Sequence, residues 1–132
     1  MTTCPFCTIA PEKIVDQNTH TRTIRDTLPV SPGHALILPK RHIASIFEAT
    51  KDEVAALWDA LQRARTQLLK EFSPDGFNIG INDGLAAGQT ILHLHIHLIP
   101  RYKGDMPDPR GGIRWIFPDK AVYWKDSCLS PS

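Results

Sequence analysis

Three histidines alternate with apolar residues over five consecutive positions, at His93, His95 and His97. Successive side chains of a β-strand point to opposite faces, so a strand here would place the three imidazoles on one face and Leu94 and Ile96 on the other. The outer face of an ordinary half-buried strand carries residues such as Thr, Lys or Glu. Three histidines on one face therefore indicate a functional row on a strand whose aliphatic face is buried.

Imidazole can perform two kinds of chemistry in such a row. It can ligate a metal ion, or it can act as nucleophile and acid at a phosphorus centre, because it titrates near neutral pH and has two distinct ring nitrogens. Gln89 and Thr90 come just before the row, and Asn82 lies across a loop. Their neutral donors suit phosphate oxygens better than a metal ion. Phosphate chemistry is favoured, and one catalytic metal held by all three histidines is the alternative.

The residues of this region resemble the signature of the histidine triad (HIT) family, in which histidines alternate with apolar residues and two apolar residues close the run. The resemblance is carried by residues 88–90 (Gly-Gln-Thr) and 93–99 (His-Leu-His-Ile-His-Leu-Ile), and it extends to residues 31–42 and 82–84. Among family members, the sequence is most similar in style to bacterial proteins described as diadenosine polyphosphate hydrolase-like.

The resemblance implies a nucleotidyl hydrolase or transferase. It makes His95 the nucleophile that attacks the α-phosphorus of a purine nucleotide derivative, either a dinucleoside polyphosphate or a nucleoside phosphoramidate. Water then cleaves the nucleotidyl-histidine, which divides one displacement into two easier steps. His97 is expected to help with proton transfer, and His34 is expected to line the same site. A nucleotide-binding interaction module with weak hydrolytic activity is the alternative.

The resemblance also implies how the substrate is held. Gln89 and Thr90 are expected to hold phosphate oxygens, with Asn82 nearby, and Asp26 falls where the family places an acidic residue that binds the ribose hydroxyls. Members of the family usually form twofold homodimers, so a homodimer is expected. The leaving group, the physiological substrate and the purine preference do not follow from the sequence.

Cys4 and Cys7 have the two-residue spacing of a zinc knuckle or of a dithiol redox motif. The redox motif needs a strand before its first cysteine, and only residues 1–3 precede Cys4. A closed zinc site needs two more ligands, and the resemblance implies that they are His42 and His93. Such a structural zinc would tie residues 1–10 to the histidine strand. Two free thiols without a metal are the alternative.

The composition limits the classes of partner. The chain has 132 residues, of which 42% are hydrophobic and 22% charged, as in ordinary globular domains. A net charge of +1 gives no general attraction to nucleic acid or anionic membranes, so neither is expected as a partner. No apolar run is long enough to span a bilayer, and a secretory signal is not evident. Three cysteines do not make a disulfide framework, so a cytoplasmic location is expected.

The strands that must position the histidines are predicted from apolar patterns and turn residues. They are expected at residues 19–26, 34–38, 77–81, 91–99 and 113–117. The stretch up to Asn18 is expected to be turn-rich. Residues 82–89 contain an Asp-Gly turn signal and are expected to form a hairpin-like loop.

One long helix is expected to begin after Thr50, which forms a capping box with Glu53, and to stop at residues 73–76. Apolar residues recur at helical spacing and are expected to form its buried face: Val54, Leu57, Trp58, Leu61, Leu68, Leu69 and Phe72. These elements predict an α+β fold with a mostly antiparallel sheet of about five strands, one main helix and a shorter one. A single domain is expected over residues 1–132, with residues 106–132 as a C-terminal extension.

Overall fold

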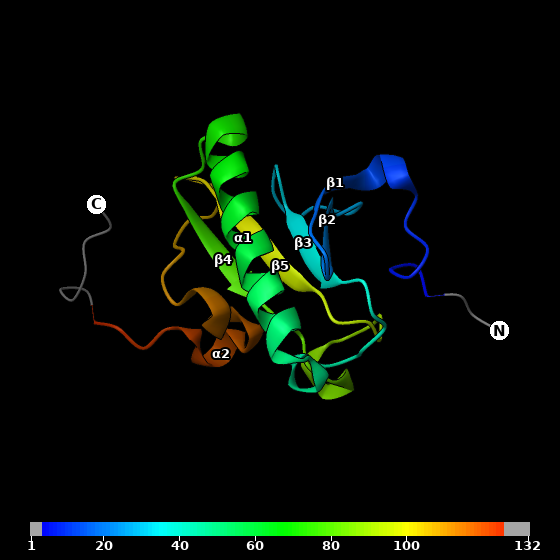
Figure 1. The fold of residues 1–132 in the computed structure, drawn as a ribbon. Coiled ribbons are helices and arrows are strands. Elements are labelled where there is room, and N and C mark those ends of the chain that lie inside the picture. The colour runs from blue at the N-terminus through cyan, green and yellow to red at the C-terminus, as the bar shows by residue number, and fades with distance from the viewer. Residues whose placement is uncertain (1–3, 126–132) are drawn as a thin grey trace. The chain divides into compact units, whose positions relative to one another are not determined.

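Five antiparallel strands form the sheet that carries part of the histidine row (Figure 1), in the order β1-β2-β3-β5-β4. The strands are β1 (Ile14–Gln17), β2 (Thr21–Arg25), β3 (Ala35–Pro39), β4 (Gly76–Gly80) and β5 (Ile96–Arg101). The computed structural model describes residues 4–125, and the chain divides into two compact units, Met1–Tyr102 and Lys103–Ser132. The predicted α+β class is confirmed, whereas a single domain over the whole chain stays a prediction.

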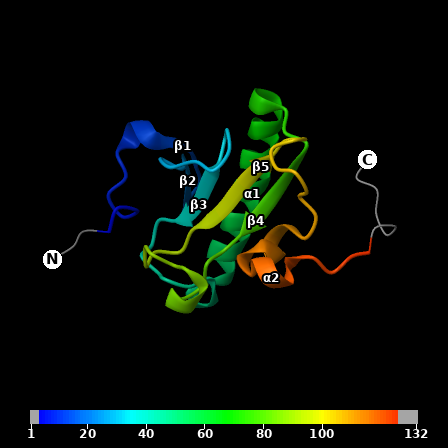
Figure 2. The same ribbon diagram turned by 180° about the vertical axis from the view of Figure 1, so that it is seen from behind.

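One long helix, α1 (Lys51–Phe72), crosses one face of the sheet, and the view from behind shows the strands in front of it (Figure 2). The predicted capping box is confirmed, because Thr50 Oγ1 accepts from the Glu53 amide at 3.1 Å and Glu53 Oε1 accepts from the Thr50 amide at 2.9 Å. The helix ends at Ser73, which has a left-handed φ of 52°. No helix of the described chain is both long and apolar enough to cross a membrane.

The buried face of α1 is narrower than the sequence suggested. Leu57, Leu61 and Leu68 are buried as predicted, but Trp58 is 60% exposed and Val54 is 43% exposed, so the prediction for these two is wrong. Two alanines complete the buried stripe (Ala60 and Ala64). Their small side chains let the helix approach the sheet, and Trp58, one position after Leu57, is rotated about 100° away from that stripe.

The predicted strands at residues 19–26, 34–38 and 77–81 are confirmed within a few residues by β2, β3 and β4. The prediction of a turn-rich stretch up to Asn18 missed β1, a four-residue strand at the sheet edge whose residues are half-buried and exposed in turn. Its register shifts between Ile14 and Asp16. Short bulged edge strands bury few apolar side chains, and so they leave a weak pattern in the sequence.

The strand predicted at residues 91–99 begins later, at Ile96. Gly80 at the end of β4 pairs with His97, so residues 81–95 form a long connection rather than a tight hairpin. Gly84 adopts a φ of 96° at the predicted turn and is followed by a 3-10 turn over Leu85–Ala87. Within this connection the Leu94 amide donates to the Ile43 carbonyl at 2.6 Å, outside any strand ladder.

Apolar side chains cover both faces of the sheet at β3. Ile37 belongs to the core between the sheet and α1, together with Ile96 and Leu98 of β5. Leu36 and Leu38 belong to a second cluster, with Phe6 from the N-terminal segment. His97 pairs with Leu36, and it alternates with Ile96 and Leu98 along β5, so it shares the second face.

The histidine face is therefore not a solvent face. His93 is 0% exposed and His95 is 9% exposed, whereas a polar outer face was predicted. The second apolar cluster, which includes Phe6, packs on this side of the sheet. The sequence could not show this because the covering residues come from the other end of the chain.

The unit at Lys103–Ser132 contains no strand among its described residues, and the strand predicted at 113–117 is wrong. Residues Gly112–Ile116 form a 3-10 helix and Pro118–Ala121 form the short helix α2. Gly111, with a φ of 90°, begins the turn and accepts from the Arg114 amide at 2.9 Å. The indole of Trp115 donates to the Arg110 carbonyl at 2.7 Å, which holds the turn in place.

Candidate active site and metal centre

His95 lies immediately before β5, and its proton is placed by the backbone. Its Nδ1 is 2.8 Å from the carbonyl oxygen of His93. A carbonyl only accepts hydrogen bonds, so Nδ1 carries the proton and Nε2 keeps its lone pair. Among the described residues Nε2 has no hydrogen-bond partner. His95 therefore presents a nucleophilic nitrogen in an almost fully buried ring.

His97 carries its proton on the opposite nitrogen. The Val30 amide donates to Nδ1 of His34 at 3.2 Å, so the neutral His34 ring has its proton on Nε2. That nitrogen is 2.9 Å from Nδ1 of His97, which must accept and therefore leaves the His97 proton on Nε2. Asp26 Oδ2 also lies 3.5 Å from Nε2 of His34. A chain of contacts beginning at a backbone amide thus fixes the tautomer of His97.

Burial favours the neutral form of the His34 and His97 rings. Desolvation lowers the pKa of His34, against the opposing influence of the Asp26 carboxylate. Desolvation likewise lowers the pKa of His97, and the neighbouring His95 and His34 rings lower it further. The site therefore holds an Nε2–H on His97 beside the His95 ring, whose Nδ1 faces the His93 carbonyl, and the two ring centroids are 5.2 Å apart.

A cleft of about 350 Å³ brings most of the predicted site residues together. Its lining includes His95 and His97 together with Asp26, Asn82 and Thr90. The polar groups come from the end of β2, from the connection before β5 and from β5 itself. The apolar side chains come from β2, β3, the N-terminal segment and the same connection. A cleft lined by both polar groups and apolar side chains can hold a ligand that has a charged part and a flat apolar part.

Gln89 does not line this cleft. It is buried, its Oε1 accepts from the Gly84 amide at 2.9 Å, and its Nε2 donates to the carbonyls of Ala44 at 2.9 Å and Ile91 at 3.2 Å. The side chain therefore holds the connection between β4 and β5 in shape. The predicted role of Gln89 in holding phosphate oxygens through its side chain would require it to give up one of these bonds.

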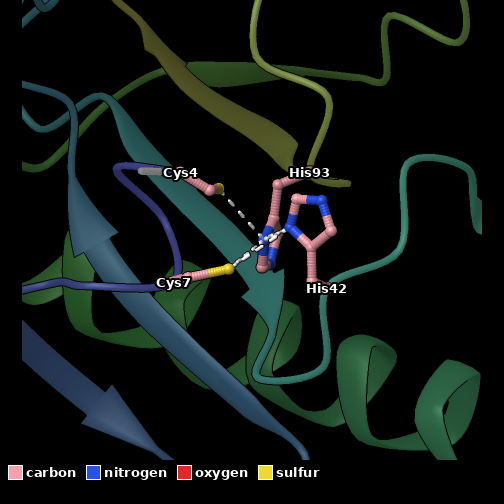
Figure 3. Close-up of side chains that lie close together, drawn as sticks. All are labelled: Cys4, Cys7, His42 and His93. Carbon is pink, nitrogen blue, oxygen red and sulfur yellow. Dashed lines mark hydrogen bonds between the residues drawn. The ribbon is translucent and has the colours of Figure 1, made fainter. Parts of the chain in front are cut away.

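Cys4, Cys7, His42 and His93 converge at one point, although they come from three distant segments (Figure 3). Their ligand atoms all lie within 4.8 Å of one another. The Cys7 sulfur is 3.2 Å from Nδ1 of His42, and the two Nδ1 atoms of His42 and His93 are 3.1 Å apart. This is the group of four residues that the sequence indicated as a zinc site.

The donor chemistry of this group fits a tetrahedral zinc ion. Nε2 of His93 is 2.8 Å from the Pro39 carbonyl, so it carries the proton and Nδ1 keeps its lone pair. That lone pair faces the sulfurs of Cys4 and Cys7, each 3.6 Å away. A histidine ligand whose other nitrogen donates to a carbonyl is typical of zinc centres.

A second group, Asp26, His34 and His97, also has its ligand atoms within 4.8 Å of one another. A metal there would displace the proton from Nε2 of His34, and a neutral ring would then carry its proton on Nδ1. The Val30 amide already donates to that atom, so two donors would face each other. The arrangement suits a hydrogen-bonded chain and not a metal. His93, His95 and His97 do not form a metal-binding group in the described residues, since His93 faces the two cysteines.

Sequence reasoning missed Phe6 as part of the site. Its ring lines the cleft and meets the His95 ring edge-on, with 5.0 Å between the centroids. The available signal was that Phe6 lies in the sequence between two candidate metal ligands, Cys4 and Cys7. A larger open hollow of about 420 Å³ along α1, near Gln62 and Lys70, holds no histidine or cysteine.

The family model of the HIT domain matches residues 8–104. The chain belongs to the HIT family. An uncharacterized HIT-like protein of Methanocaldococcus jannaschii is 37% identical over 106 residues, which are 77% of this chain and 81% of the relative. The bis(5'-adenosyl)-triphosphatase of Dictyostelium discoideum is 46% identical over 77 residues, 58% of this chain and 52% of that enzyme, so this HIT protein spans about half of its length.

Solved structures agree with this assignment. The crystal structure of a zinc-bound histidine triad family protein from Mycobacterium smegmatis superimposes with a TM-score of 0.71 at 34% identity, covering 80% of this chain and 84% of that one. At this identity the likeness reflects the family as well as the fold. The family match ends at residue 104, so the turn and short helix of the second unit lie outside it.

Proposed function

We propose that this HIT protein is a nucleotidyl hydrolase or transferase that acts at the α-phosphate of a purine nucleotide derivative through a covalent intermediate on His95. The observation that carries the proposal is the pair of opposed tautomers in one cleft, with a bare Nε2 on His95 and an Nε2–H on His97. The name of the Dictyostelium relative, a bis(5'-adenosyl)-triphosphatase, supports a dinucleoside polyphosphate as substrate.

In the first step, the lone pair on Nε2 of His95 attacks the α-phosphorus and forms an N–P bond. The P–O bond to the rest of the polyphosphate breaks, and the leaving group departs as an anion that accepts a hydrogen bond from Nε2–H of His97. The positive charge that develops on the His95 ring is stabilised because Nδ1–H still donates to the His93 carbonyl. This backbone bond therefore strengthens as the intermediate forms.

In the second step, water attacks the same phosphorus, the N–P bond breaks and its electron pair returns to Nε2 of His95. The water oxygen remains on the nucleoside monophosphate, and its extra proton passes to solvent. The two-step path avoids a single crowded displacement. A transferase differs only in that another acceptor takes the place of water.

The polar lining of the cleft supports the proposed binding mode. Asp26 accepts from the Leu28 amide through Oδ1 at 2.9 Å, and its carboxylate keeps further lone pairs for ribose hydroxyls. Thr90 and Asn82 supply neutral donors near the two catalytic histidines. Ile24 and Leu36 form part of the apolar wall, which suits a purine ring.

We also propose that Cys4, Cys7, His42 and His93 hold a structural zinc ion. Zinc there would cross-link the N-terminal segment to the loop after β3 and to the segment before β5. Its contribution is to folding and position rather than to the reaction.

A trapping experiment tests the reaction. The zinc-loaded protein is mixed with diadenosine tetraphosphate, quenched within one turnover and digested, and an adenylylated peptide carrying the modification on His95 is expected by mass spectrometry. His95→Asn should bind AMP but lose turnover by about 10³-fold or more, since the nucleophile is absent. His20→Asn is the control, because that histidine lies outside the cleft. Normal turnover by His95→Asn would overturn the mechanism, and AMP binding without turnover of any substrate would identify a nucleotide-binding module instead.

A homodimer is proposed as well, and the edge strand β4 supports it. β4 ends the strand order, so one of its sides has no partner strand in the described chain, and Ile79 on it is exposed. Such an edge pairs readily with a second copy of the same strand. Light scattering at micromolar concentration should give twice the chain mass, with Ile79→Lys shifting the protein toward monomer. A monomeric mass for the wild-type protein would contradict this proposal.

A further inference from the structure

Phe6 connects the proposed metal centre to the proposed nucleophile. It lies between Cys4 and Cys7, it is 8% exposed, and its ring centroid is 5.0 Å from that of His95 and 6.0 Å from that of His93. The same ring lines the cleft. A displacement of the cysteine segment must therefore move one wall of the cleft and a ring in contact with the nucleophile.

The segment that carries Phe6 is attached to the sheet by side chains only. In the described part of the chain, the backbone hydrogen bonds of residues 4–9 stay within the segment, as in the Cys7 amide donating to the Cys4 carbonyl at 3.1 Å. Thr8 Oγ1 donates to the same carbonyl at 3.2 Å. Two kinds of attachment to the sheet remain. One is apolar packing of Phe6, with Cys4 and Ile9 beside it, in the cluster that contains Leu36, and the other is the pair of thiols that face His42 and His93.

A second connection between the two sites exists, but it does not depend on metal. His93 offers Nδ1 to the cysteines, and its carbonyl accepts from Nδ1 of His95. Its ring is held separately by the Pro39 carbonyl, and the adjoining backbone is held by the bond from the Leu94 amide to Ile43. The carbonyl that orients His95 therefore keeps its place without a metal, whereas the segment that carries Phe6 loses the attachment through its thiols and keeps only its apolar packing.

We propose that metal loading at Cys4, Cys7, His42 and His93 raises the nucleotide affinity of the cleft by holding Phe6 in place as its wall. In the metal-free protein, nucleotide binding must order the segment that carries Phe6, and this cost weakens the observed affinity. With metal bound, the wall is already formed. Because such coupling is reciprocal, nucleotide must raise the metal affinity by the same factor. The inference rests on the proposed nucleotide site and makes Phe6 a positioning residue.

Calorimetry on the full chain measures this coupling. AMP is titrated into zinc-loaded protein and into protein stripped with a chelator, and we expect about tenfold tighter binding to the loaded form, within the usual range for coupled sites. In Phe6→Ala the two affinities should become equal, close to that of the stripped wild-type protein. Phe6→Leu, which keeps most of the packing, should retain part of the difference. Circular dichroism checks that each form is folded.

Ile24→Ala is the matched control. Ile24 belongs to the same apolar cluster and lines the same cleft, but the pairing of β2 with β3 holds its backbone. The variant should weaken AMP binding in both states and leave the loaded-to-stripped ratio near tenfold. A loss of the ratio in Ile24→Ala as large as in Phe6→Ala would overturn the assignment to Phe6.

A chromogenic chelator that competes for zinc gives the reciprocal measurement. Saturating AMP should raise the zinc affinity of the wild-type protein about tenfold and that of Phe6→Ala not at all. Equal AMP affinity in loaded and stripped wild-type protein would overturn the coupling while leaving the nucleotide site intact. An absence of AMP binding in both states would overturn the proposed function and the coupling together.

Discussion

Two groups of side chains in this protein look alike as ligand sets and differ in where their protons lie. Cys4, Cys7, His42 and His93 form one, and Asp26, His34 and His97 form the other; within each group the candidate ligand atoms lie within 4.8 Å of one another. In the first, a backbone carbonyl accepts from Nε2 of His93, which turns a lone pair toward the sulfurs. In the second, a backbone amide donates to Nδ1 of His34, which turns a proton toward His97.

The comparison shows that residue type and proximity do not by themselves distinguish a group that could bind a metal from a hydrogen-bonded chain of side chains. The backbone group on the far side of each ring decides it, because a neutral imidazole has one donor and one acceptor. When a backbone carbonyl accepts from one ring nitrogen, the other nitrogen has a lone pair that can bind a metal. When a backbone amide donates to one ring nitrogen, the other nitrogen carries the proton.

Among the changes that test this comparison, removal of His34 should have the largest effect on activity. In His34→Asn, the hydrogen bond that fixes the tautomer of His97 is lost, so we expect kcat for diadenosine tetraphosphate to fall about 10²- to 10³-fold, in the range of acid–base contributions. Zinc content, measured by atomic absorption, should not change. A loss of zinc in this variant would mean that the two groups are not separate, which would break the comparison.

Removal of Cys7 should have the complementary effect. Cys7→Ser should weaken zinc binding by more than about a hundredfold. Loss of a ligand should cost more than loss of a residue that only forms a hydrogen bond to a ligand. In cobalt-substituted protein the thiolate charge-transfer absorption should weaken accordingly. His97→Asn is the control, and its cobalt spectrum should match that of the wild-type protein. A change in that spectrum would place the metal in the Asp26 group instead.

The pH dependence of stability tests the protonation of His34 and His97 in the second group, and its effect should be smaller than those of the two substitutions above. Burial lowers the pKa of His34 and His97 below the unfolded value of 6.5, so the unfolded chain binds more protons in this range. The contribution of these two histidines to the unfolding free energy is therefore fully present above pH 6.5. It is lost as the pH falls from 6.5 through their lower pKa values in the folded state. Urea titrations between pH 7 and pH 5 should show a shallower fall for His34→Asn than for the wild-type protein. Equal slopes would show that His34 is not held neutral by burial.

An ion pair between the exposed Arg41 and the buried Glu53 shows how tertiary contacts act on an element that local sequence already defines. Glu53 closes the capping box of α1, as predicted, and the fold adds Arg41, whose guanidinium lies 2.7 Å from Glu53 Oε1. The hydrogen bond from Arg41 and that from the Thr50 amide lower the pKa of Glu53 to about 2. Capping needs only neighbouring residues, so the helix start was predictable, whereas the Arg41 contact was not.

The errors of sequence reasoning have physical causes of the same kind. Trp58 fits a helical apolar pattern, but the sheet meets α1 along a narrower stripe in which alanines allow close approach. The strand predicted at residues 113–117 became a 3-10 helix because Gly111 adopts a left-handed conformation at its start. The histidine face was expected to be the outer face of a half-buried strand, and an apolar cluster that includes Phe6 covers it. In each case the residues that decide the structure lie outside the sequence pattern from which the element was predicted.

The sequence by itself determined the family, the fold class, the capping of the long helix and the set of histidines and cysteines that lie close together in space. The fold class and the capping depend on residue types and on short spacings along the chain, whereas the set of close histidines and cysteines followed from the resemblance to the HIT family. Only the tertiary structure decided which nitrogen of each imidazole carries the proton and that Phe6 joins the two sites. The carbonyl of Pro39 meets His93 across the fold, and a tautomer is set by whichever backbone group the fold places beside the ring.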